Sequence, residues 1–321
     1  MPSIPKTMRA AAIDRFGGPE EVTIHTLPVP EIGTREILIA VHTAGVASWD
    51  AAMRRGWWPE GKPEFPLVLG SDGSGTVAKV GSQVRGFKEH DEVYAYAFAN
   101  PKGGCHAEYA AVAAASAGHR PRRLNLEEVG AIGTTGLTAW QGVERLDPGK
   151  RDPVVVFGAS GGVGTLAVQF AKWRGARILA IAAGKDGVRL VTELVGLDLA
   201  VDGKRQDVGA EIDEFAPEGL AGVLAFAGGE GLEACVERVR PGGRVVHPNG
   251  VEPAPKQRRG IEIISYDAEP GPQQFARLNE AVEGARLKVP ISASFPLEQA
   301  AEAHQRLAAG HVIGKIVLRV A

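Results

Sequence analysis

A glycine-rich loop near the middle of the chain constrains the fold more than any other feature. The sequence FGASGGVG at 157–164 continues the uninterrupted apolar run 154–157 and precedes a stretch with helical spacing. Such a loop between a strand and a helix is typical of dinucleotide-binding βαβ units, and the alternative is a glycine-rich turn without a ligand. Ala159 takes the place of the motif's first glycine, Gly161 lets the backbone approach a pyrophosphate, and Gly164 lets helix and strand pack closely. We therefore predict that the start of this helix binds cofactor phosphates, with a site formed by Ala159, Ser160, Gly161, Gly162, Val163 and Gly164.

Short apolar strands and helical stretches alternate between residues 125 and 265. The expected strands are 154–157, 177–182, 199–201, 222–226, 244–247 and 261–265. The expected helices are 126–146 (interrupted near 133–136), 163–174, 187–195, 208–215 and 232–239. This alternation predicts an α/β fold, with a doubly wound domain built on a parallel sheet.

The segments on either side of this domain have a different pattern. Between residues 8 and 112 the signals are short and rich in β-branched residues, with expected strands at 9–13, 22–26, 37–43, 75–80 and 92–97. They predict a compact, mostly antiparallel β domain. After residue 266 come two helical stretches, 272–286 and 298–309, interleaved with strands 289–295 and 315–320. We expect this tail to return to the first domain, giving a split domain of 1–124 and 266–321 around 125–265.

The residues after the second strand of the doubly wound domain favour NADP(H) over NAD(H). An acidic residue about 20 positions beyond the glycine loop would bind the ribose 2′-OH of NAD. The chain has Ala-Gly-Lys-Asp at 183–186 instead, and Arg189 lies one helical turn further on. Lys185 and Arg189 suit a 2′-phosphate, although both could also be solvated surface charges. We interpret Asp186 as the N-cap of the following helix.

Composition and charge exclude several other classes of protein. A net charge of −2 lacks the basic excess of a nucleic-acid-binding protein. Two cysteines, Cys105 and Cys235, form no disulfide framework and no four-thiolate zinc site. The N-terminal sequence has no apolar core of the kind a signal peptide needs, and the apolar windows 107–118 and 177–184 are too short to span a membrane. We expect a cytoplasmic protein without nucleic-acid or membrane partners.

Motifs along nearly the whole chain resemble those of one known family. They are RAAAIDRFGGP at 9–19, GVASWD at 45–50, PLVLGSD at 66–72, GFKEHDEV at 86–93, GLTAW at 136–140, the glycine loop, PGGR at 241–244 and GKIV at 314–317. Their identity and order resemble the zinc-independent quinone oxidoreductase branch of the medium-chain dehydrogenase/reductase superfamily. The resemblance implies a GroES-like catalytic domain, a Rossmann domain with six parallel strands, and a homodimer formed largely through the Rossmann sheets.

The resemblance also implies that no metal is bound. Zinc-dependent relatives would have a cysteine at position 47, a histidine and a glutamate at 71 and 72, and a four-cysteine lobe near 90–115. The chain has Ala47, Ser71 and Asp72 at these positions, and only Cys105 in the lobe region. Without these ligands zinc has nothing to hold it.

Several residues match positions that contact the cofactor or substrate in this family. Cofactor contacts are implied for Thr135, Phe226, Asn249 and Lys315. The segment expected to face the substrate contains Ser48, Asp50, Trp57 and Trp58, of which Asp50 is better suited to ordering its own loop than to proton transfer. The chain departs from the family at Ala47 and Ala52, where relatives commonly have Asn and Tyr, and we assign no catalytic residue.

These residues predict a metal-independent transfer of hydride from NADPH. Without a metal, only an acceptor that is already electron-poor should react, namely a small planar quinone or a similar conjugated carbonyl compound. An NADPH-dependent reductase of enones or enals is an alternative. A non-catalytic NADPH-binding or sensor protein is another, since Ala47 and Ala52 lack the family's usual side chains.

Overall fold

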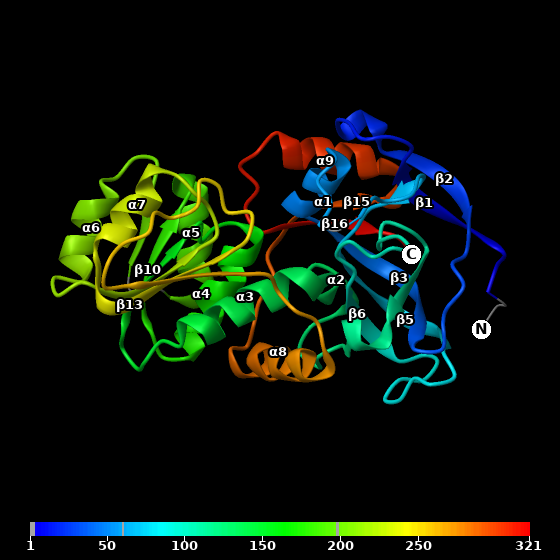
Figure 1. Ribbon diagram of the computed structural model, residues 1–321, viewed down its shortest axis with the longest axis horizontal. Helices are drawn as coiled ribbons and strands as arrows, with labels where there is room; N and C mark the ends of the chain where they lie inside the picture. Colours follow the sequence, from blue (N-terminus) through cyan, green and yellow to red (C-terminus); the bar gives the residue numbers. More distant parts are fainter. Residues whose placement is uncertain (1–3, 60, 197–198) are drawn as a thin grey trace. The chain divides into compact units, whose positions relative to one another are not determined.

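The computed structural model describes residues 4–59, 61–196 and 199–321, which divide into two compact units (Figure 1). Unit 1 comprises Met1–Thr135, Pro270–Asn279 and Ile291–Ala321, and unit 2 comprises Gly136–Glu269 and Glu280–Pro290. This division differs from the expected 125–265 in two places. The segment 125–135 lies in unit 1, where the helix at its start contacts three strands of that unit. The segment 280–290 lies in unit 2, where the Lys288 N–H donates to the side chain of Gln169 at 2.8 Å.

Unit 2 is built on a six-stranded parallel sheet in the order β11-β10-β9-β12-β13-β14. Its strands are β9 (Pro153–Phe157), β10 (Arg177–Ala182), β11 (Leu199–Asp202), β12 (Leu220–Ala225), β13 (Val239–Pro248) and β14 (Glu262–Tyr266). Val154, Val155 and Val156 of β9 are fully buried, because helices cover both faces of the sheet. The strand order is that of the Rossmann fold, which confirms the predicted doubly wound domain.

The helices of unit 2 are α3 (Gly133–Leu146, which begins in unit 1), α4 (Gly162–Trp173), α5 (Gly184–Val195), α6 (Val208–Phe215) and α7 (Glu230–Glu237). Helices α4 to α7 connect the strands of the sheet, and α3 precedes the first of them. Helix α4 contacts α5, and α6 contacts α7. The right-handed crossover rule places the two pairs on opposite faces, because the chain reverses direction across the sheet between β11 and β12.

The interruption expected within 126–146 lies earlier than predicted. Helix α2 (Leu126–Val129) ends before the glycines at 133 and 136, and α3 begins at Gly133 itself. A Cβ atom on Gly133 would lie 1.9 Å from the carbonyl oxygen of Ala95. Gly133 is therefore required by a close approach of the helix start to a strand of unit 1, and it does not break the helix.

Unit 1 is mostly antiparallel, as predicted. One sheet has the order β15-β16-β3-β5-β6-β8, with β7 also paired to β3, and a smaller sheet has the order β2-β1-β4. The strands are β1 (Thr7–Ile13), β2 (Thr23–Pro28), β3 (Glu36–Val46), β4 (Leu67–Val68), β5 (Asp72–Val80), β6 (Glu92–Tyr96), β7 (Tyr109–Ala113), β8 (Ala117–His119), β15 (Ile291–Pro296) and β16 (Lys315–Arg319). The helices are α1 (Ser48–Arg54), α2, α8 (Pro272–Gly284, which ends in unit 2) and α9 (Ala300–Ala308). Strand β16 pairs with β3, so the C-terminal segment returns to the first domain as expected.

Four elements of unit 1 have no sequence prediction, namely α1, β4, β7 and β8. Helix α1 is short, β4 has two residues, and β7 and β8 contain mainly alanine and other small residues. A strand is predicted from apolar and polar residues that alternate along the chain. Segments made mainly of alanine and other small residues do not show this alternation. Among the residues that the structure describes, no helix is long and apolar enough to cross a membrane.

Candidate functional site

Four segments with predicted cofactor residues lie at the carboxyl ends of the strands of the unit 2 sheet. The glycine loop follows β9, the segment 183–186 follows β10, Phe226 follows β12 and Asn249 follows β13. Since all six strands are parallel, their carboxyl ends all lie at the same end of the sheet. The strand order reverses between β9 and β12, and open α/β sheets bind ligands at such a switch point.

The geometry of the glycine loop suits a phosphate group. Gly158 has a φ of +78°, and a Cβ on Gly164 would lie 2.2 Å from the carbonyl oxygen of Gly158. Gly161 is the N-cap of α4, and having no side chain it accepts no hydrogen bond from the first N–H groups of the helix. A Cβ on Gly161 would meet only the Gly158 oxygen, at 3.5 Å. The space above Gly161 and the free N–H groups of α4 thus fit the pyrophosphate of a dinucleotide.

The residues around the loop connect it to neighbouring strands. Ser160 is buried, and its Oγ accepts the N–H of Ala183 at 3.2 Å, which joins the loop to the end of β10. The N–H of Phe226 donates to the Phe157 carbonyl at 2.9 Å, so Phe226 lies beside the loop. The exposed Asn249 donates from Nδ2 to Asp267 Oδ2 at 2.8 Å, which occupies one of its two amide hydrogens.

The start of α5 carries the predicted basic residues and differs from the prediction in its cap. Helix α5 begins at Gly184, and its N-cap is Ala183, whose side chain makes no capping hydrogen bond. The predicted N-cap role of Asp186 is wrong, because Asp186 lies within the first turn and its Oδ1 accepts the N–H of Gly187 at 3.0 Å. Lys185 and Arg189 are both exposed on this helix.

Asp202 contributes a carboxylate at the start of α5 that sequence reasoning missed. It ends β11, the neighbour of β10, and its Oδ1 accepts the N–H groups of Gly184 at 3.0 Å and Lys204 at 3.1 Å. The pKa of the Asp202 carboxyl lies below its ordinary value, chiefly because of the hydrogen bond from Gly184. The sequence contained enough information to find Asp202. It directly follows the expected strand 199–201, and the carboxyl ends of adjacent parallel strands lie close together.

In unit 1, the structure brings Thr135 and Lys315 together around Asp72. The Lys315 ammonium lies 3.0 Å from Asp72 Oδ2 and 2.7 Å from Thr135 Oγ1, and the Thr135 hydroxyl donates to the same carboxylate at 2.6 Å. The N–H groups of Thr134 and Thr135 donate to Asp72 Oδ1 at 2.5 and 3.1 Å. The three side chains are almost fully buried. Asp72 thus balances both the ammonium and the positive N-terminal end of α3.

The residues at the positions of the family's zinc ligands do not fit a zinc ion. Ala47 has no donor atom, and the Ser71 hydroxyl donates to Asp50 Oδ1 at 2.7 Å. Asp72 already accepts four hydrogen bonds, one of them from an ammonium group that would repel a divalent cation. No group of three histidine, cysteine or acidic side chains suitable for a metal occurs in the part of the chain that the structure describes.

The four predicted substrate residues lie on α1 and just after it. Ser48 is exposed at the start of α1, whereas Asp50 is fully buried and accepts N–H groups from Ala47 at 2.8 Å and Ser71 at 2.9 Å. Burial raises the pKa of the Asp50 carboxyl. Asp50 is therefore part of the internal bonding of its loop and lines no open pocket.

The two tryptophans lie at a surface with other aromatic residues. Trp57 is 50% exposed, and its ring centroid lies 5.8 Å from that of Phe98, which in turn lies 6.1 Å from Tyr96. Trp58 packs against the hydrophobic core of unit 1. Trp57 and Phe98 thus present a partly exposed aromatic surface.

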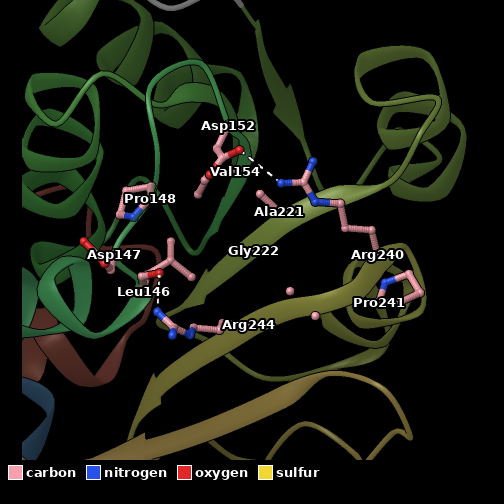
Figure 2. Close-up of a pocket in the computed structure, with 12 residues that line it drawn as sticks. Leu146, Asp147, Pro148, Asp152, Val154, Ala221, Gly222, Arg240, Pro241 and Arg244 are labelled. Carbon is pink, nitrogen blue, oxygen red and sulfur yellow. Dashed lines mark hydrogen bonds and ion pairs between the residues drawn. The ribbon is translucent and has the colours of Figure 1, made fainter.

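A cavity of about 260 Å³ in unit 2 contains none of the predicted residues (Figure 2). It lies at the amino ends of the strands, beside Val154 near the start of β9 and Ala221 near the start of β12. Arg240 and Arg244 reach its two sides, where Arg240 binds Asp152 at 3.1 Å and Arg244 donates to the Leu146 carbonyl at 3.4 Å. This cavity is separate from the glycine loop, which follows the carboxyl end of β9.

The fold and the glycine loop together define a class of dinucleotide-binding proteins, and comparison with known proteins shows that the chain is similar to oxidoreductases of this class. Residues 33–164 match the alcohol dehydrogenase GroES-like domain, and residues 195–318 match the zinc-binding dehydrogenase family. The quinone oxidoreductase of Mus musculus is 30% identical over 98% of each chain. The chloroplastic NADPH-dependent alkenal/one oxidoreductase of Arabidopsis thaliana is 31% identical over 98% of this chain and 80% of its own. A solved NAD-dependent alcohol dehydrogenase has a TM-score of 0.89 at 30% identity, covering 98% of this chain and all of the other.

The chain belongs to the medium-chain dehydrogenase/reductase superfamily, and within it to the quinone oxidoreductase branch. This confirms the resemblance drawn from the sequence motifs. The protein is accordingly an NAD(P)-dependent oxidoreductase with a GroES-like domain and a Rossmann domain.

Proposed function

We propose that this protein transfers a hydride from NADPH to a quinone without the help of a metal ion. The observation that carries the proposal is the open backbone at Gly161, where the free N–H groups of α4 meet the switch point of the sheet. This arrangement suits the pyrophosphate of a nicotinamide dinucleotide. The exposed Lys185 and Arg189 at the start of α5 favour the form with a 2′-phosphate.

The donor set of unit 1 supports metal independence. At the positions of the family's zinc ligands, the side chains of Ala47, Ser71 and the lysine-paired Asp72 do not form a set of ligands that suits zinc. Without a Lewis acid to polarise a simple carbonyl, the acceptor must itself be electron-poor, as a quinone is. The aromatic surface of Trp57 and Phe98 provides a flat apolar wall for a planar ring.

The chain's own residues mainly bind and orient the reactants. NADPH supplies the hydride when bound, while the glycine loop holds its phosphates and Phe226 stands beside that loop. We expect Thr135 and Lys315, which Asp72 fixes in one geometry, to contact the cofactor as they do in the family. Reduction of a conjugated acceptor can take its proton from water, so the mechanism requires no dedicated general acid.

Reduction of an enone or enal is the second candidate. The observation in its favour is the 31% identity to an enzyme named an alkenal/one oxidoreductase. Both acceptors are conjugated carbonyl compounds, so the same metal-free site would serve either. One similar solved structure is named as NAD-dependent. The choice between NADPH and NADH is therefore tested separately, by assaying the protein with each of the two nucleotides.

Consumption of NADPH with a panel of acceptors tests these functions. Purified protein, before and after dialysis against EDTA, would be assayed with NADPH and with NADH on a benzoquinone, a naphthoquinone and an enone. We expect the quinones to give the highest kcat/KM with NADPH and EDTA to have no effect. Turnover of the enone alone supports the second candidate, and NADPH binding without any turnover supports a non-catalytic protein. Loss of activity after EDTA treatment that zinc restores contradicts metal independence.

The cytoplasmic location, the absence of nucleic-acid and membrane partners, and the homodimer stay predictions from sequence and resemblance. The edge strand β14 pairs only with β13 within the described residues. A second copy that extends the sheet from this edge would satisfy its free backbone groups.

A further inference from the structure

We infer that Asp202 is a residue that sets cofactor specificity by opposing the 2′-phosphate of NADPH at the start of α5. The inference rests on the proposed function, because it concerns the same nucleotide site. It predicts that the preference for NADPH over NADH is weaker than the basic residues at this site would give alone, and that Asp202 is the cause.

The first observation is the position of the carboxylate. Asp202 Oδ1 accepts the N–H of Gly184, the first residue of α5, at 3.0 Å. The N–H groups at a helix start are the ones that bind an incoming phosphate. Here one of them is already bound to an anionic side chain of the protein, so Asp202 occupies a donor that a phosphate would otherwise use.

The second observation is an incompletely neutralised charge. The Asp202 side chain is 8% exposed, and its buried Oδ2 has no hydrogen-bond partner in the part of the chain that is described. The cation nearest to it is Arg205, whose Nε lies 3.8 Å away and whose side chain is 72% exposed. A solvated arginine at this distance screens a carboxylate only partly. The negative charge is therefore felt at the helix start.

The third observation is the arrangement of charges around this carboxylate. Lys185 and Arg189 lie on α5, and Lys204 and Arg205 follow β11; all four are exposed. In NAD-specific Rossmann domains the acidic residue follows the second strand, whereas this chain has glycine and lysine there, and its acid is the last residue of the neighbouring third strand, β11. Attraction of a 2′-phosphate by the basic residues is thus offset by a carboxylate fixed through Gly184 and Lys204. A 2′-hydroxyl is uncharged and does not experience this offset.

Replacement of Asp202 by asparagine tests the inference. Asp202→Asn keeps an oxygen that accepts from Gly184 and removes the charge. We expect the Kd of NADPH, measured by its fluorescence, to fall about fivefold, the size expected for one carboxylate near a phosphate in a solvated site. We expect the Kd of NADH to change less than about twofold, and 2′,5′-ADP and 5′-AMP to show the same contrast in calorimetry. High salt should reduce the shift.

The controls separate charge from structure. Asp213→Asn removes another acid of unit 2, an exposed one on α6 that pairs with Arg238, the C-cap residue of α7. This variant should leave both affinities unchanged. Asp202→Ser keeps a neutral oxygen and serves if the asparagine variant does not fold. Equal changes for NADPH and NADH, or no change for NADPH, in a folded variant overturn the inference.

The same measurements distinguish this inference from the proposed function. In one outcome, the wild-type protein reduces no quinone, while the Asp202→Asn variant binds NADPH, but not NADH, more tightly than the wild type does. This result refutes the proposed function and supports the role of Asp202. A wild-type protein that binds neither nucleotide refutes both.

Discussion

Replacing Asp72 by asparagine removes the negative charge that holds Lys315 inside unit 1. The ammonium lies 3.0 Å from the carboxylate, and both side chains are at most 4% exposed. At an effective dielectric constant of about 20, the attraction at this distance is about 5 kcal/mol, part of which offsets the cost of burying both charges. Removing one partner of a buried pair costs about 3–5 kcal/mol. Asparagine still accepts from Thr134 and Thr135, so we expect the lower end, about 3 kcal/mol.

A double-mutant cycle with Lys315→Met isolates the pair. Each single variant leaves one buried charge unpaired, whereas the double variant leaves none. The double variant should therefore be destabilised by at least about 1 kcal/mol less than the sum of the two single variants. The assay is urea unfolding followed by tryptophan fluorescence, to which Trp49 contributes because its ring lies 5.9 Å from the Lys315 nitrogen. Strict additivity, or a cost below about 1 kcal/mol for Asp72→Asn, would refute the account of a coupled buried pair.

Three further predictions concern the glycine loop, a buried histidine and the assembly. Gly161→Asp places a carboxylate at the pyrophosphate and should abolish NADPH binding in a fluorescence titration. Its melting temperature should stay near that of Gly161→Ala, since a Cβ at this position meets only one atom, at 3.5 Å. An unchanged affinity for NADPH would contradict the assignment of the glycine loop to phosphate binding. Burial holds the pKa of His304, which faces His106 and Arg54, well below 6.5. As the pH drops below about 6.5, the imidazole therefore takes up a proton only in the unfolded chain. The free energy of unfolding should then fall by up to about 1.4 kcal/mol per pH unit. His304→Leu should lessen this decline in urea titrations at several pH values, and an identical pH profile would show that His304 does not contribute. Light scattering should give a mass of about twice 33.7 kDa, and a mass of one chain rules out the homodimer.

Sequence periodicity determined most of unit 2 because its elements are local and strongly patterned. The apolar run of β9 and the helices α4 and α6 lie within a residue or two of their expected bounds. Strand β13 begins earlier than expected, at Val239, because it includes the glycines of the PGG sequence, which carry no strand signal. In unit 1, the small side chains of β7 and β8 gave no pattern, and pairing with β3 and β6 decides their structure.

The candidate site divides in the same way. The glycine loop and the basic start of α5 could be named from the sequence, because both depend on neighbours a few residues away. The predicted cap at Asp186 was wrong, since Gly184 adopts a φ of +76° and the helix starts there, three residues before the expected start at Gly187. No local pattern distinguishes these two starts.

The sequence by itself determined the class of protein, through a strand, a glycine loop and a helix that are contiguous. Only the tertiary structure decided which charges meet. Asp72 and Lys315 are 243 positions apart, and strand pairing between β16, β3 and β5 brings their strands together. Asp202 reaches Gly184 because β11 lies next to β10. A charge acts through distance in space, and spacing along the chain specifies that distance only for near neighbours.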